Sequence, residues 1–233
     1  GTPQRVATGY DGRRLALLNN DTIPDPFWLE ELLRAADFAG GAAAAKLVFA
    51  HDPTLVNSGG LTLLRDGRGA DLGFRQPDDG RFEAGGPVFA GCGAGVLVAR
   101  PPAGRPLLDP RFFLYYEDLD LFWRGRLDGR GCVLAPRSLV RHAHGAAAGD
   151  ASPVFWFHVE RNRALTALRT ADPFLALWSG LGLFARAVRA LLLGVAGRRP
   201  WPVAGAVVRA AADYLRLAPR MLVERYMLRG WAS

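Results

Sequence analysis

The chain has 233 residues, of which 50% are hydrophobic, so it can bury a sizeable core and disorder is excluded. Its formal net charge is +7, and the excess is C-terminal, because residues 161–233 carry twelve arginines against three acidic residues. Cys92 and Cys132 lie far apart and outside any CxxC pair, so the sequence implies no disulfide framework and no cysteine zinc site. Free thiols in a reducing compartment are expected.

The first predicted strand ends at a group of polar residues. Residues 14–18 are a short apolar run followed by Asn19-Asn20-Asp21-Thr22, which is typical of a buried strand and a turn. Prolines block a longer strand, and a helix is predicted to begin at Asp25 or Pro26. Asp21 then lies at the carboxyl end of a strand, where ligands of α/β sheets gather. The alternative is an ordinary strand-to-helix turn capped by Asn and Asp.

A glycine-rich region lies between two further predicted strands, at 44–50 and 96–98. Residues 62–64 and 73–74 are candidate pieces of a short hairpin. In the segment Gly91-Cys92-Gly93-Ala94-Gly95, the missing side chains of Gly91 and Gly93 allow close approach of a ligand or of another backbone. A bulged strand explains the same glycines equally well.

The segment 112–126, FFLYYEDLDLFWRGR, places Glu117, Asp118 and Asp120 within four residues. Carboxylates this dense repel one another unless a cation or a shared proton lies between them, and this pattern is typical of metal sites and general bases. Acidic residues also favour the first turn of a helix, so a simple helix start is the alternative.

Two histidines follow the next predicted strand, which is expected to cover 130–136 and to end at its proline. A single histidine is usually structural, but His142 and His144 together, downstream of the carboxylates, raise the prospect of a site. A helix is then predicted over 155–170. Arg161 lies near its middle, where it either binds phosphate or is solvated.

The C-terminal tail alternates apolar and arginine-rich segments. Residues 174–196 are apolar except for Ser179, Arg186 and Arg189, and two arginines near the middle disfavour a simple transmembrane helix. An amphipathic helix on an anionic membrane surface is favoured, followed by a break at 198–202 and one or two helices over 203–228. A helical cap on the sheet is the alternative. Nucleic-acid binding is not expected, because the arginines are interspersed with apolar residues and no motif is present.

Taken in order, these segments resemble the family 2 glycosyltransferases. The segments that carry the resemblance are LLNNDT at 17–22, GCGAG at 91–95, FFLYYEDLDLFWR at 112–124, His142, and ERNR at 160–163. They are most similar to the rhamnosyltransferase and galactofuranosyltransferase-like branch, over about residues 9–170. The resemblance implies an α/β fold of the GT-A type, here in part, with a C-terminal helical extension.

The resemblance also implies cofactors and roles. Members transfer a sugar, with inversion, from a nucleotide diphosphate donor, here dTDP- or UDP-linked, using a divalent cation such as Mn²⁺ or Mg²⁺. Asp21 and His142 are expected to hold the metal, and Asp118 to act as general base, with Glu117 shaping the acceptor site. The expected donor-binding residues are Asn20, Gly91, Gly93 and Arg161, with Arg161 facing the diphosphate.

The resemblance further implies an organisation and a location. Residues 1–170 are expected to form the metal and acceptor part of the transferase domain, and residues 171–233 a membrane-associating tail. Acceptors would be glycans or lipid-linked glycans of the cell envelope, made on the cytoplasmic face of the membrane. Because the chain begins almost at the Asp21 strand, we expect a fragment or truncated enzyme with little activity alone. The alternatives are a non-catalytic remnant that binds membrane or a partner subunit, and a metal-dependent phosphate-ester hydrolase.

Overall fold

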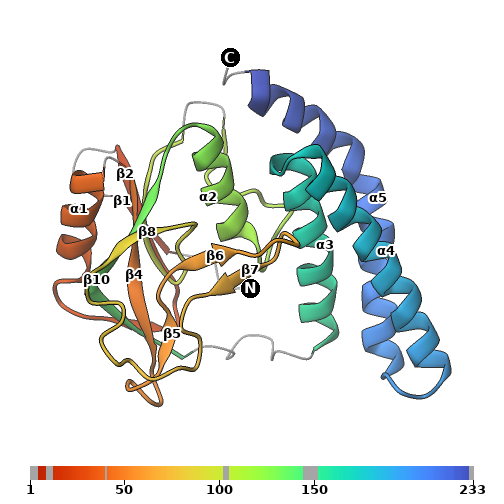
Figure 1. Cartoon of the computed structure of the whole chain (residues 1–233), viewed down its shortest axis with the longest axis horizontal. Coiled ribbons are helices and arrows are strands. Elements are labelled where there is room, and N and C mark those ends of the chain that lie inside the picture. Colours follow the sequence, from red (N-terminus) through yellow and green to blue (C-terminus); the bar gives the residue numbers. More distant parts are fainter. Residues whose placement is uncertain (1–4, 9–12, 40, 102–104, 144–151, 231–233) are drawn as a thin grey trace. The chain divides into compact units, whose positions relative to one another are not determined.

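The computed structural model describes residues 5–8, 13–39, 41–101, 105–143 and 152–230 (Figure 1). The chain divides into two compact units. The sheet unit comprises residues 1–63, 69–108 and 121–146, and the helical unit comprises 64–68, 109–120 and 147–233. The protein is therefore a mixed α/β protein, as predicted.

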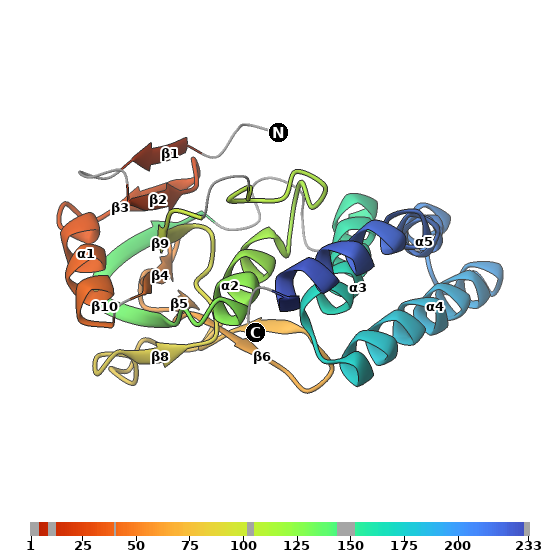
Figure 2. The ribbon, with the colours of Figure 1, turned by 90° about the horizontal axis from the view of Figure 1, so that it is seen from above.

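The sheet unit contains an eight-stranded mixed sheet (Figure 2). Its main path runs, in spatial order, through β1 (Arg5–Thr8), β2 (Arg14–Leu18), β9 (Gly95–Ala99), β4 (Ala42–Phe49), β10 (Cys132–His142) and β3 (Thr22–Pro24). Beside this path, β5 (Val56–Ser58) pairs with β4 and β8 (Gly86–Val88) pairs with β10. β4 and β10 are parallel, whereas the other pairs are antiparallel. A separate hairpin joins β6 (Leu61–Leu63) to β7 (Gly69–Asp71).

The core of the sheet unit lies between the sheet and α1 (Trp28–Ala39), which runs beside β4 and β10 (Figure 1). Leu32 and Ala36, one turn apart on α1, are fully buried against the sheet. Every residue of β4 is buried, and Ala43 and Ala45, which share the cluster of Leu32 and Ala36, are small enough to let the helix approach closely. Burial thus overrides the weak strand propensity of an alanine run.

The predicted strands at 14–18, 44–50 and 96–98 are confirmed as β2, β4 and β9. Two other predictions are wrong. Residues 73–74 are not a strand, because the partner of β6 is β7. The strand predicted to end at Pro136 continues to His142 as β10. The register against β4 shifts between Ala135 and Leu139, and this irregularity accommodates a proline that cannot donate to the ladder.

The helical unit contains α3 (Pro153–Thr170), α4 (Pro173–Val195) and α5 (Trp201–Gly230), each packed on the other two. Side chains cap two of them: Ser152 accepts from the Phe155 N–H, and Asp172 accepts from the Phe174 and Leu175 N–H groups. A fourth helix, α2 (Glu117–Leu127), begins in the helical unit, and its residues from 121 onward belong to the sheet unit.

α5 is one helix rather than two, although Pro219 lies inside it. Its buried residues recur at helical spacing on both sides of that proline, and Pro219 itself is on the exposed side. The buried repeat includes Val207, Tyr214, Met221 and Leu228. All of α3, α4 and α5 belong to the helical unit, and they pack on one another.

Among the described helices, α4 is long and apolar enough to cross a membrane by length and composition. Its buried face consists mainly of small residues, whereas large apolar side chains are exposed on another face. The exposed stripe comprises Phe174, Leu177, Trp178, Leu181, Val188, Leu191, Leu192 and Val195.

Candidate functional site

The two expected metal ligands, Asp21 and His142, lie together in the sheet unit. Antiparallel pairing of β3 with β10 sets Thr22 opposite His142, and the Asp21 carbonyl accepts from the Ala143 N–H at 2.9 Å. This register brings the Asp21 Oδ1 atom to 3.3 Å from the His142 Nε2 atom. Residues 121 positions apart in the chain are therefore neighbours because two strands pair.

Asn57, on β5, orients the His142 ring. Its Oδ1 atom lies 2.8 Å from Nδ1 of His142, and both side chains are buried. With Asn57 Oδ1 as acceptor, Nδ1 carries the proton and the Nε2 lone pair is directed toward Asp21. Many metal-binding histidines have this arrangement, in which an outer hydrogen bond fixes the tautomer and the ring.

The Asp21–His142 pair has a spacing that suits a divalent cation. Two ligand atoms about 2.1 Å from one ion and at right angles lie about 3 Å apart, close to the 3.3 Å between Oδ1 and Nε2. The described residues contain no group of three or more His, Cys, Asp or Glu side chains placed to hold a metal. Water and phosphate oxygens would complete the coordination, as is usual for Mg²⁺. If Nε2 carried a proton as well, the same contact would instead be an Asp–His ion pair that fastens β3 to β10.

The expected donor-binding residues of the sheet unit differ in exposure. Asn20 is exposed beside Asp21, whereas Gly91 and Gly93 are buried. A Cβ atom on Gly91 would lie 2.4 Å from Val96 Cγ1 and 2.9 Å from the Cβ of Ala44. The absent side chain of Gly91 therefore makes room for the sheet core, and packing alone accounts for this glycine.

The three carboxylates of the acidic segment lie in different environments in the helical unit. Asp120 is fully buried and paired with Arg169, whose Nε atom donates to it at 3.0 Å. Arg169 also donates to Asp109 at 2.7 Å and to Glu224 at 2.9 Å. Burial opposes ionisation of Asp109, but hydrogen bonds from Arg111 and the charge of Arg169 outweigh it, so its pKa lies below the usual range. Asp120 therefore belongs to a structural ion-pair network.

Glu117 and Asp118 begin α2 and are both half-buried. Burial, followed by the charges of Asp118 and Asp120, raises the pKa of Glu117 to about 8. The Glu117 Oε2 atom is shielded from solvent and has no hydrogen-bond partner among the described residues. The protonated form of Glu117 is therefore favoured. Asp118 is the remaining candidate base of the cluster, and its Oδ1 accepts from the Leu119 N–H at 2.7 Å.

A strained loop precedes these carboxylates. Phe113, Tyr115 and Tyr116 have φ angles of 55°, 62° and 68°, which bulky residues rarely adopt. The Nδ2 atom of Asn162 on α3 donates to the carbonyls of Phe112, Leu114 and Tyr115 at 2.9, 2.9 and 2.7 Å. A buried amide on α3 therefore holds the loop in the conformation that leads into Glu117.

Arg161 is engaged inside the helical unit. Its guanidinium donates to Asp213 at 2.7 Å, to the Arg111 carbonyl at 2.6 Å and to Asn162 Oδ1 at 2.9 Å. It also lies 4.8 Å from the centre of the Phe157 ring. These contacts give Arg161 a structural role in holding Arg111 and Asn162. Its expected contact with a diphosphate stays a prediction.

Sequence reasoning did not find Asn57, and it assigned no role to Asn162. No periodicity marks Asn57, which reaches His142 only through strand pairing. Asn162 stood within the ERNR segment, and all four residues of that segment are buried. The available signal was the run of four polar residues, ERNR, near the middle of a predicted helix. His144 lies outside the described residues.

Comparison with protein-family models finds no match, and a search of curated proteins finds no relative of this chain.

Proposed function

We propose that this chain is a metal-dependent, inverting glycosyltransferase of the family 2 type with a GT-A fold, or the metal and acceptor part of one. It would transfer a sugar from a dTDP- or UDP-linked donor to a glycan or lipid-linked acceptor in cell-envelope synthesis. The observation that carries the proposal is the Asp21–His142 pair at 3.3 Å, with Asn57 on the far ring nitrogen.

Asp21 and His142 would hold Mn²⁺ or Mg²⁺ through one carboxylate oxygen and one imidazole nitrogen. The ion would supply positive charge to the departing diphosphate. Asn57 keeps the Nε2 lone pair of His142 available for this contact. Asn20, exposed beside Asp21, would contribute to the donor side.

Asp118 would accept the proton of the acceptor hydroxyl while that oxygen bonds to the anomeric carbon and the bond from carbon to diphosphate breaks. The raised pKa of Glu117 supports this division of roles, because a protonated neighbour does not add a second negative charge. Glu117 would then donate a hydrogen bond within the acceptor site. The Asn162-held loop fixes the start of α2, which carries both groups.

The helical unit would associate with the cytoplasmic face of the membrane. The exposed apolar stripe of α4 and the arginines of α4 and α5 support this, because apolar area and cationic charge together drive interfacial binding. A lipid-linked acceptor would be reached at that surface. The second candidate function is that of a non-catalytic remnant that binds membrane, because such a remnant would retain the same apolar stripe of α4.

Titration calorimetry with UDP and dTDP, with and without Mn²⁺, separates the two candidates. Binding that requires Mn²⁺ and is lost in Asp21→Ala and His142→Ala, but kept in the neighbouring Ser58→Ala control, supports the transferase. A folded chain that binds neither nucleotide with metal present contradicts a donor site in this chain and favours the remnant.

A further inference from the structure

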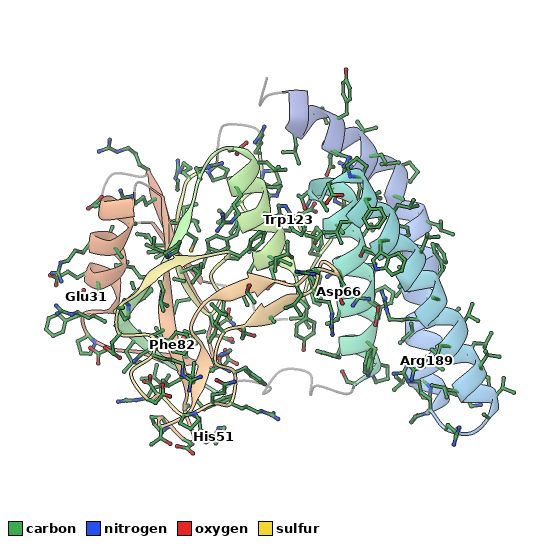
Figure 3. All side chains as sticks on the ribbon, viewed as in Figure 1. Glu31, His51, Asp66, Phe82, Trp123 and Arg189 are labelled. Carbon is green, nitrogen blue, oxygen red and sulfur yellow. The ribbon has the colours of Figure 1, made fainter. Side chains whose placement is uncertain are left out.

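A cavity of about 260 Å³ lies within the helical unit, apart from the residues assigned above to catalysis. Its lining combines three arginines with an aromatic ring, a hydroxyl and one carboxylate: Arg163, Arg186, Arg189, Trp178, Ser179 and Asp66. Figure 3 labels two of these residues, Asp66 on the β6–β7 loop and Arg189 on α4. No part of the proposed transferase mechanism uses this cavity.

One buried carboxylate holds two of the three arginines. The Glu160 Oε2 atom accepts from Arg163 Nη2 at 3.0 Å and from Arg186 Nε at 2.6 Å. Asp66, the acidic residue of the lining, is paired with Arg68 at 2.7 Å. The positive charge of the cavity therefore exceeds what its neighbouring carboxylates neutralise.

Polar atoms of the lining lack partners. Arg163 Nε, Arg186 Nη2 and Ser179 Oγ are each buried and make no hydrogen bond to any described residue. Arg163 and Ser179 are more than nine-tenths buried, at 7% and 3% exposure. Because a buried donor without an acceptor is costly, such a set is expected where an acceptor binds. A phosphate group offers several acceptor oxygens and is the anion that guanidinium groups recognise best.

Trp178 connects the cavity to the apolar stripe of α4. It lines the cavity, yet 58% of it is exposed and its ring stacks on Phe174, with centroids 6.5 Å apart. An amphiphile with an anionic head and apolar chains fits this arrangement, since the head meets the arginines and the chains meet the stripe.

We propose that this cavity binds the terminal phosphate of an anionic lipid whose chains lie along the exposed face of α4. The inference rests on the membrane association proposed above and is independent of sugar transfer. Gly182 also lines the cavity. Its missing side chain leaves room for the Arg186 guanidinium, because a Cβ atom there would lie 2.8 Å from the Arg186 Nη1 atom.

The test is co-sedimentation of the full chain with vesicles that contain phosphatidic acid or, at matched surface charge, phosphatidylserine. Salt of about 0.3 M screens longer-range attraction. We expect at least tenfold preference for phosphatidic acid, lost in Arg186→Lys, which keeps the charge but not the planar donor fork. Arg189→Gln, in the cavity, should weaken binding about tenfold, whereas Arg209→Gln, exposed on α5 outside the cavity, should change it less than twofold.

Three outcomes would overturn the proposal. If the chain binds both vesicles equally, and Arg186→Lys does not change this binding, membrane association would be supported but the phosphate site would be refuted. Equal losses in Arg189→Gln and Arg209→Gln would indicate charge attraction alone. Metal-free binding of inorganic pyrophosphate that is lost in Arg189→Gln, by a folded chain that binds neither vesicle, would assign the cavity to a soluble phosphate compound and refute membrane association. Circular dichroism of each variant reports its folding.

Discussion

At the scale of single residues, function depends on how neighbours set the state of each titratable group. Asn57 sets the tautomer of His142, and burial, followed by the charge of Asp118, raises the pKa of Glu117. The pattern of the sequence was sufficient to select Asp21, Glu117, Asp118 and His142 as candidates. It was not sufficient to find Asn57, because the contact arises from β5 pairing with β4 next to β10.

Replacing Asn57 with leucine should weaken Mn²⁺ binding by about 10- to 100-fold, because the His142 ring loses the acceptor that fixes its tautomer. Calorimetry in the presence of UDP measures this. Ser58→Ala is the matched control, since the Ser58 hydroxyl donates to the Gly60 carbonyl and not to His142. Unchanged affinity in Asn57→Leu would remove this residue from the site.

Glu117→Gln should reduce the loss of stability with rising pH. The folded-state pKa of Glu117 is about 8, above the ordinary 4.5, so between these values the unfolded chain binds fewer protons than the folded one. Stability therefore falls as pH rises through this window, with a slope of at most about 1.4 kcal/mol per pH unit. Urea unfolding from pH 5 to 8 should give a shallower decline for the variant. Parallel curves for both proteins would show that Glu117 is ionised in the fold.

At the scale of elements, local pattern predicted the longer strands and the helices, but it ended one strand too early, at Pro136, and left open whether residues 203–228 form one helix or two. β10 passes Pro136 through a register shift, and α5 passes Pro219 with that residue on the exposed side. In both cases tertiary packing on either side outweighs the local cost. The location of the buried polar residues depends on how the helices pack, and a single sequence does not reveal this packing.

Asn162→Leu should destabilise the protein by about 2–4 kcal/mol, because three carbonyls of the strained loop lose their donor. Urea unfolding measures the change. Asn20→Ala, at an exposed position, is the control and should stay within about 0.5 kcal/mol of the unaltered protein. A similarly small effect for Asn162→Leu would mean that the loop holds its conformation without α3.

Gly91→Ala should cost about 1–3 kcal/mol through overpacking, since its new Cβ would lie 2.4 Å from Val96 Cγ1. Gly131→Ala is the control, because a Cβ there meets nothing within 4 Å. Thermal unfolding distinguishes them. If Gly91→Ala leaves the stability unchanged, there is open space at this position, and a role of Gly91 in donor binding would be favoured.

At the scale of the whole molecule, charge is unevenly distributed between residues 1–160 and residues 161–233. Residues 1–160 carry seventeen basic and nineteen acidic residues, whereas the C-terminal segment is strongly basic. Part of that basic charge is used internally, since Arg161, Arg163 and Arg169 are buried and paired. The sequence predicted the basic apolar tail, but the division between internal and exposed arginines depends on which helix faces pack.

The central claim is that Asp21 and His142 hold a metal that contacts a nucleotide diphosphate. Pulsed electron paramagnetic resonance of the chain with Mn²⁺ and UDP tests it most directly, because a coordinated imidazole nitrogen modulates the electron spin echo. We predict a nitrogen signal from His142 that disappears in His142→Ala, and weaker Mn²⁺ binding in Asp21→Ala. Bound Mn²⁺ without a nitrogen signal, or a signal that survives in His142→Ala, would contradict the assignment.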